Sequence, residues 1–318
     1  MATYSDFLSI PKVELHVHLE GSIRPETVLA LARRNDVALP ADTLDGLRQW
    51  YQFRDFDHFV EVYVAVTRCI QSAQDIELIA LEFAREQVRQ NIMHSEVTYT
   101  CGTIETHCGI PWKEQIAALR EAQAYARSEL GVTFTLILDI VRGWTPDRAM
   151  AMTRNAVEAH GTGVCALGLA GVEREVPAEL YRDAIQYAAD AGLPFIPHAG
   201  ETCGPESIWE VLPFNPTRIG HGVRCLEDEN LVRELKDRRI PLEVCPSSNV
   251  CLGVVPSWRE HPLKRLMDAG LVVTINSDDP PMFSTDLTTE LLRSHETFGL
   301  TVEEVAERMA VARSVALP

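Results

Sequence analysis

Four separated segments of the chain carry side chains that can bind a metal ion or transfer a proton. These segments are His16-Val17-His18, His198-Ala199-Gly200-Glu201, Gly220-His221-Gly222 and Asn276-Ser277-Asp278-Asp279-Pro280. Three imidazoles and one carboxylate suit Zn²⁺ and leave a position for water, and iron, cobalt or nickel would accept the same ligands. Because such an ion lowers the pKa of bound water toward neutrality, these segments predict hydrolytic chemistry if they meet in space.

The spacing within each segment supports a common site, although each segment alone is weak evidence. In a β-strand, residues i and i+2 project to the same side, so His16 and His18 can face one ion together. A lone histidine such as His221 is more often a hydrogen-bonded structural residue, and an acidic pair often caps a turn. The joint occurrence of the four segments therefore carries the prediction of a metal site.

The elements that must position these residues follow a regular alternation. Eight β-rich runs are separated by amphipathic helical patterns such as residues 75–90 and 177–192. The runs are residues 12–19, 94–100, 133–141, 164–171, 193–200, 218–222, 240–246 and 271–277. Alternating strands and helices indicate a parallel sheet, and eight such units favour an α/β fold of the closed (β/α)8 TIM-barrel type. Active sites of such barrels lie at the C-terminal ends of the strands, where all four segments fall.

We expect residues 1–318 to form a single barrel domain, with extra helices inserted after the first strand unit at residues 36–72. No low-complexity linker interrupts the chain. In this insert, Phe53, Phe56 and Phe59 fit either a lid over a pocket or an ordinary apolar helix face. Arg54 and Arg68 fit solvated surface positions, or contacts to a carboxylate on a large substrate.

Composition narrows the partners to small molecules. The chain has 29 Lys and Arg against 46 Asp and Glu, a net charge of −17, which disfavours nucleic acid and anionic membranes. The N-terminal residues show no signal-peptide pattern, and no long apolar run suggests a membrane span, so we expect a cytoplasmic protein. The eight cysteines form no CxxC pair and are expected to be reduced core thiols. The oligomeric state stays open.

Five sequence blocks resemble the signatures of the adenosine deaminase family. They are PKVELHVHLEGS (11–22), PHAGE (197–201), RIGHG (218–222), CPSSN (245–249) and NSDDP (276–280), in the family's order. The resemblance covers nearly the whole chain and implies a hydrolase that removes the 6-amino group of a purine by attack of metal-activated water on C6. It also implies one zinc ion per chain.

Carried over position by position, the resemblance implies a role for each site residue. His16, His18, His198 and Asp278 correspond to the zinc ligands, and Glu201 to the acid that protonates the purine at N1. His221 corresponds to the histidine beside the attacking water, and Asp279 to the residue that meets N7. Gly171 corresponds to the glycine whose backbone N–H reaches N3, although a simple packing glycine is the rival interpretation. Glu20 stands where other members contact the ribose.

The native substrate stays open at this point. Adenosine or a close 6-aminopurine nucleoside is favoured, with 6-aminodeoxyfutalosine as the nearest alternative. Free adenine is less favoured because Gly220, rather than Asp, precedes His221. From other classes, a dinuclear amidohydrolase would usually need a bridging Lys on the fourth strand, which GVCALGLAG lacks. A non-catalytic purine-binding protein should have lost one of the chemical residues, and none is missing.

Overall fold

A barrel of parallel strands forms the centre of the protein in the computed structural model, which describes residues 2–174 and 176–318. Eight strands pair in the order β1 to β8, each parallel to its neighbour. The strands are β1 (Lys12–His18), β2 (Ile92–Tyr99), β3 (Thr133–Val141), β4 (Val164–Ala170), β5 (Phe195–Ala199), β6 (Ile219–His221), β7 (Leu242–Val244) and β8 (Val273–Ile275). A parallel bridge between Val17 and Asp278 joins β1 to the segment after β8. The predicted α/β barrel is thus confirmed, nearly closed.

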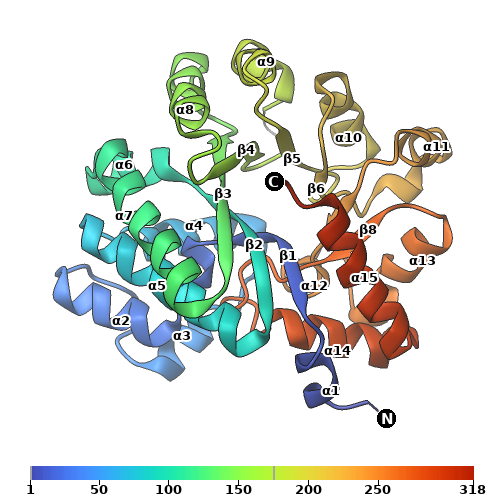
Figure 1. Cartoon of the computed structure of the whole chain (residues 1–318), viewed down its shortest axis with the longest axis horizontal. Coiled ribbons are helices and arrows are strands. Elements are labelled where there is room, and N and C mark those ends of the chain that lie inside the picture. The colour runs from blue at the N-terminus through green and yellow to red at the C-terminus, as the bar shows by residue number, and fades with distance from the viewer. Residues whose placement is uncertain (1, 175) are drawn as a thin grey trace.

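Helices surround the strands on the outside, as Figure 1 shows. The barrel strands are apolar along most of their length because helices cover their outer face and side chains fill the interior. The helices that follow the strands are α5 (Ala73–Gln90), α6 (Cys101–Cys108), α7 (Trp112–Tyr125), α8 (Pro146–Ala159), α9 (Arg182–Asp190), α10 (Pro205–Val211), α11 (Glu229–Arg238), α12 (Pro246–Cys251), α13 (Leu263–Asp268), α14 (Leu287–Phe298) and α15 (Val302–Val315). The short helices α1 (Tyr4–Leu8) and α2 (Pro25–Arg34) flank β1.

The predicted insertion after the first strand unit is helical, as expected. It contains α3 (Leu44–Trp50) and α4 (Phe56–Thr67). The carboxylate of Asp55 caps α4 by accepting a hydrogen bond from the backbone N–H of His58 at 2.8 Å. Because Asp55 fixes where α4 begins, Phe56 and Phe59 lie in its first turn.

A buried ion network fills the barrel at the N-terminal end of the strands. Arg218, with no exposed surface, pairs with Glu96 on β2 and Glu243 on β7. The last residues of α15 close this end, since Arg218 donates to the backbone oxygen of Val315 at 2.8 Å and Leu317 donates to Glu96. Charged groups that are paired in this way can be buried, whereas unpaired ones could not. The opposite end of the barrel is left open for a cavity.

Two smaller expectations concern cysteines and membrane spans. All eight cysteines are free thiols, and Cys69, Cys101, Cys165, Cys225 and Cys245 are buried, as expected for core residues. Within residues 2–174 and 176–318, none of the helices combines the length and apolar character needed to cross a bilayer.

Candidate active site

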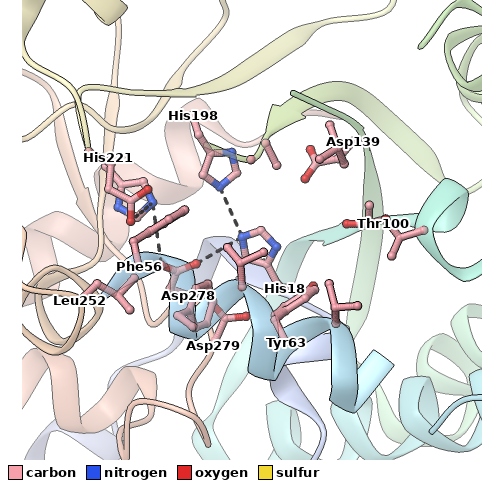
Figure 2. Close-up of a pocket in the computed structure, with 18 residues that line it drawn as sticks. His18, Phe56, Tyr63, Thr100, Asp139, His198, His221, Leu252, Asp278 and Asp279 are labelled. Carbon is pink, nitrogen blue, oxygen red and sulfur yellow. Dashed lines mark hydrogen bonds and ion pairs between the residues drawn. The ribbon is translucent and has the colours of Figure 1, made fainter. Parts of the chain in front are cut away.

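The C-terminal ends of the strands enclose a cavity of about 140 Å³ that holds most of the predicted site residues. His18, Gly171, His198, Glu201, His221, Asp278 and Asp279 all line it. His16 is not part of the lining but is buried beside Asp278, with 2% of its surface exposed. Figure 2 shows His18, His198, His221 and Asp278 converging on one side of the cavity. Segments up to 262 residues apart in the chain, from His16 to Asp278, thus meet at one place.

Three close contacts connect the four predicted metal ligands. Oδ1 of Asp278 is 3.2 Å from Nε2 of His18 and 3.5 Å from Nε2 of His16, and Nε2 of His198 is 3.3 Å from Nε2 of His18. The imidazoles of His16, His18, His198 and His221 crowd together, with neighbouring ring centroids 4.7 to 5.5 Å apart. Such crowding of basic rings around a carboxylate favours a bound cation.

The Nδ1 atoms of two of these imidazoles are held by the protein, which turns their Nε2 atoms toward the cluster. Nδ1 of His16 is 2.9 Å from Oε2 of Glu243, and Nδ1 of His198 is 3.1 Å from the backbone oxygen of Leu169. Nε2 of His16 is buried and has no hydrogen-bond partner among the described residues. Metal-binding histidines are characteristically oriented by such contacts at the second nitrogen. The residues present therefore fit a divalent metal ion.

The backbone is strained at two of the site residues. His221 and Asp278 have φ of 61° and 65°, values that side-chain-bearing residues rarely adopt. Asp278 is held there from both directions, because its N–H donates to the oxygen of His16 at 3.1 Å and its oxygen accepts from the N–H of His18 at 2.9 Å. The first strand thus fixes the carboxylate of Asp278 against its own two histidines.

His221 is oriented by a chain of polar contacts from behind. Nδ1 of His221 lies 3.2 Å from Nδ2 of Asn249, whose Oδ1 lies 3.1 Å from Nε2 of His261. If the amide of Asn249 donates, the neutral imidazole of His221 carries its proton on Nε2. This nitrogen is 3.6 Å from Oε1 of Glu201 and 3.8 Å from Oδ2 of Asp278. Burial lowers the pKa of His221 to about 3 despite the nearby charge of Asp278.

The surroundings of two carboxylic acids in the cavity raise their pKa values and so favour the protonated forms. Burial, followed by the charges of Asp278 and Glu173, raises the pKa of Glu201 well above its usual value. Burial and the charge of Asp278 likewise raise the pKa of Asp279, whose Oδ1 has no hydrogen-bond partner among the described residues. The carboxyl of Asp279 occupies the space above Gly21, where a Cβ would lie 1.6 Å from Oδ1. Both acids can therefore donate a proton into the cavity.

Burial acts differently on the predicted ligands. It opposes ionisation of Asp278, but hydrogen bonds from His16 and His18 outweigh it and lower the pKa of Asp278 well below its usual value. It also opposes a charge on His16, yet Asp278 and Glu243 outweigh it and raise the pKa of His16. A proton and a metal ion therefore compete for Nε2 of His16.

Glu173 was not identified from the sequence, although it organises the turn that carries Glu201. Its buried carboxylate accepts hydrogen bonds from the backbone N–H groups of Gly200, Glu201 and Thr202 at 2.8, 3.0 and 2.9 Å, and from the hydroxyl of Ser207. Glu173 follows β4 by three residues, and such an acid near a strand end is the signal that could have pointed to it. The sequence analysis likewise did not identify the supporting contacts made by Glu243, Asn249 and His261.

Glu20 is not among the residues that line the cavity, and its contact with the sugar stays a prediction. It is fully buried, and its carboxylate accepts hydrogen bonds from the N–H of Thr100 at 2.9 Å and from the hydroxyl of Tyr63 at 3.2 Å. Tyr63 and Thr100 line the cavity in its place. The longer side chain of Glu20 thus supports the wall of the cavity from behind.

Gly171 and the aromatic insert combine the two interpretations offered for each. Gly171 lines the cavity, but its φ of 94° and a hypothetical Cβ 3.2 Å from the backbone nitrogen of Arg142 also require glycine for packing.

Phe56 and Phe59 line the cavity, while Phe59 also packs against Phe283 with ring centroids 5.4 Å apart. Helix α4 therefore serves both as a cavity wall and as part of the core. Phe53, Arg54 and Arg68 do not line the cavity.

Comparison with known proteins identifies the family. The sequence profile of the adenosine deaminase family matches residues 11–316. The chain belongs to the adenosine deaminase family. As a member of this family it is an aminohydrolase, an enzyme that releases an amino group by hydrolysis, and the family depends on a metal ion.

Individual members of the adenosine deaminase family are similar over most of their length. The chain is 40% identical to an aminodeoxyfutalosine deaminase of Streptomyces avermitilis, covering 90% of this chain and 81% of that protein. It is 37% identical to an adenine deaminase of Bordetella parapertussis, covering 95% of each.

Solved structures of similar proteins share the fold. A crystal structure of an adenine deaminase from Arthrobacter aurescens superposes with a TM-score of 0.92 and 30% identity, covering 98% of this chain and 94% of that one. An amidohydrolase from Burkholderia ambifaria, crystallised with bound zinc, gives a TM-score of 0.91 and 25% identity, covering 100% and 89%.

Proposed function

We propose that this enzyme hydrolyses the 6-amino group of a purine nucleoside, adenosine or a close analogue, to the inosine-type product and ammonia. The observation that carries the proposal is the position of two buried acids, Glu201 and Asp279, in the cavity that also holds the metal-competent cluster. A purine offers proton acceptors on separate edges of a flat ring, and two buried acids can meet them. We also propose that residues 1–318 act as a single domain.

His16, His18, His198 and Asp278 would hold one divalent ion per chain, with zinc as the first candidate and iron, cobalt or nickel as alternatives. When bound, such an ion lowers the pKa of a water molecule and makes it a nucleophile near neutral pH. His221, whose Nε2 faces both Asp278 and Glu201, would orient the attacking water. The left-handed backbone at His221 and Asp278 would help to hold both side chains in place at this site.

Acidic side chains of the protein would transfer the protons of the reaction. Glu201 would donate its proton to N1 of the ring as water adds to C6, which neutralises the charge that develops when aromaticity is lost. Asp279 would donate a hydrogen bond to N7, and the backbone N–H of Gly171 would reach N3. Glu201, then a carboxylate, would take the proton of the hydroxyl on C6 and pass it to the amino group, so that C6=O forms as the C6–N bond breaks and ammonia leaves. The proton that water released before the attack would return to Glu201.

The lining of the cavity favours an uncharged nucleoside over a nucleotide. Among the described residues that line it, none is Lys or Arg, whereas Asp139, Glu201, Asp278 and Asp279 are acidic. A phosphate would lose its hydration without gaining a cationic partner. The similarity to aminodeoxyfutalosine deaminase supports a second candidate, the same reaction on a nucleoside with a larger 5′ substituent.

A panel of 6-aminopurines assayed for ammonia release tests the proposal, with bound metal measured in the same preparation. Adenosine, 2′-deoxyadenosine, 6-aminodeoxyfutalosine and adenine separate the candidates. We expect turnover of at least one nucleoside to exceed that of adenine. Activity on adenine alone would overturn the nucleoside preference, and no ammonia from any compound would overturn the proposed reaction. Glu201→Gln should keep the metal and lose about 100-fold or more in kcat.

A further inference from the structure

Asp139 is a buried acid in the cavity for which the proposed mechanism has no role. It lies near the end of β3, its side chain lines the cavity, and only 1% of its surface is exposed. Neither carboxylate oxygen has a hydrogen-bond partner among the described residues. Buried polar atoms are almost always paired, so two open oxygens on one carboxyl indicate a missing ligand. Figure 2 places Asp139 across the open space from His198 and His18, next to Thr100.

The neighbouring strand makes room for this carboxyl. Asp139 pairs in register with Gly168 on β4, and a Cβ at Gly168 would lie 1.8 Å from Oδ1 of Asp139. Any side chain at Gly168 would therefore push the acid out of its present position. Because Gly168 has no side chain, the carboxyl of Asp139 can lie at the cavity wall without a partner from β4.

The side chains that line the cavity next to Asp139 are neutral, and the charges of His16 and Arg142 act on it from outside the lining. On the β2 side, the paired positions Tyr99 and Leu138 place Thr100 beside Asp139, and Thr100 and Thr103 both line the cavity. Glu20 lies behind them, and both its oxygens accept hydrogen bonds from Thr100 and Tyr63. The carboxylate of Glu20 is therefore engaged by the protein, while that of Asp139 is open to a ligand.

We propose that Asp139 is a specificity-determining residue that hydrogen-bonds hydroxyl groups on the sugar of the substrate. This inference rests on the proposed nucleoside function and specifies which part of the substrate the β2–β3 wall recognises. Hydroxyls are the matching chemistry, because a carboxyl can accept and donate hydrogen bonds, and no Lys or Arg among the described lining residues would attract an anion to this wall. Burial and the charge of Glu20 also raise the pKa of Asp139, which allows its carboxyl to donate as well as accept.

Asp139→Ala and Asp139→Asn, assayed on nucleosides that lack single hydroxyls, test this inference. The substrates are adenosine, its 2′-, 3′- and 5′-deoxy analogues, and 9-methyladenine, which has no sugar. We expect Asp139→Ala to lower kcat/KM on adenosine by about 10- to 100-fold, as for loss of a hydrogen bond to a charged or buried group. Asp139→Asn keeps one acceptor oxygen and should lose less. The loss should be smallest on the analogue that lacks the contacted hydroxyl, and 9-methyladenine should be unaffected within about twofold.

Binding of the products provides a second measurement that does not depend on turnover. Asp139→Ala should weaken binding of inosine and leave binding of hypoxanthine unchanged. Thr135→Val is the matched control, since Thr135 lies on the same strand but does not line the cavity. This variant should bind inosine and hypoxanthine as tightly as the unmodified enzyme does.

Two results would overturn the inference. One is an equal loss on adenosine and 9-methyladenine, or on inosine and hypoxanthine, because Asp139 would then act on the ring or on folding. The other is no loss on adenosine or inosine. Failure of the proposed function is distinguishable, because the unmodified enzyme itself would then release no ammonia from any of these purines.

Discussion

The carboxylate of Glu173 accepts a hydrogen bond from the backbone N–H of Glu201, with 3.0 Å between Oε1 and the nitrogen. The same carboxylate accepts from the two residues that flank Glu201, so the turn after β5 is held by a side chain from the loop after β4. The proposed proton donor thus owes its position to a residue that is neither a predicted metal ligand nor part of the cavity lining itself.

Glu173→Gln should impair turnover without releasing the metal. The amide leaves one of the backbone donors without an acceptor, so Glu201 becomes misplaced, and we expect kcat to fall by about 10- to 100-fold with a smaller change in KM. Loss of the negative charge also lowers the pKa of Glu201, since Glu173 helps to raise it. Glu201 must be protonated to act, so the alkaline limb of the kcat profile should move to lower pH.

A matched control for this variant is Glu179→Gln, in which a solvent-exposed acid on the same loop changes in the same way. It should leave kcat and its pH profile unchanged. A Glu173→Gln enzyme with full kcat and an unmoved alkaline limb would show that Glu173 does not position the proton donor.

Glu243→Gln should weaken metal binding. Glu243 is 2.9 Å from Nδ1 of His16 and fixes the ring with Nε2 facing Asp278. Loss of such a supporting carboxylate costs about 10- to 100-fold in metal affinity. Titration of metal-free protein against a competing chelator measures the change. Because Glu243 also pairs with buried Arg218, the melting temperature is recorded alongside, and unchanged affinity in a folded variant would contradict the role.

Glu290 should make the protein less stable as the pH rises from about 4.5 to 7. Its burial raises its pKa from 4.5 to about 7, against hydrogen bonds from Ser247 and Thr285 that lower it. Below pH 4.5 the group is protonated in both states and costs nothing, whereas above pH 7 the folded protein must bury a charge. The difference reaches about 3 kcal/mol.

Comparison with Glu290→Gln isolates this effect from the other titrating groups. The variant should gain stability relative to the unmodified protein as the pH is raised from 5 to 8, measured by denaturant unfolding at each pH. A stability difference that stays constant over this range would show that the carboxyl of Glu290 does not titrate as its burial requires.

The barrel and the metal cluster could be predicted because both leave local signals. Eight apolar runs bounded by helical patterns predict strands, and two histidines at i and i+2 predict a shared face whatever the strand's neighbours are. The start and end of each strand were less accurate, as for β7, where residues 240–246 were expected and Leu242–Val244 were found. Strand ends depend on pairing with neighbours, which a single run does not show.

The residues that were missed depend on contacts between distant strands. Asp139 in the run TFTLILDIV is a visible signal, since an acid within an apolar strand must be buried. Its meaning comes only from the register with Gly168 on the next strand. Glu20 is expected at the sugar because its neighbours in the chain match a family signature, and the structure adds a hydrogen bond to its carboxylate from the hydroxyl of Tyr63 on the inserted helix α4. No local pattern could reveal that pairing.

The central claim is that His16, His18, His198 and Asp278 hold one catalytic metal ion per chain. Elemental analysis of the purified enzyme, combined with an ammonia assay before and after chelation, tests it most directly. We predict one equivalent of a zinc-like metal, loss of activity on its removal with recovery on its return, and both metal and activity lost in His198→Ala. Full activity in metal-free protein, or a His198→Ala enzyme that keeps its metal and its turnover, would contradict the claim.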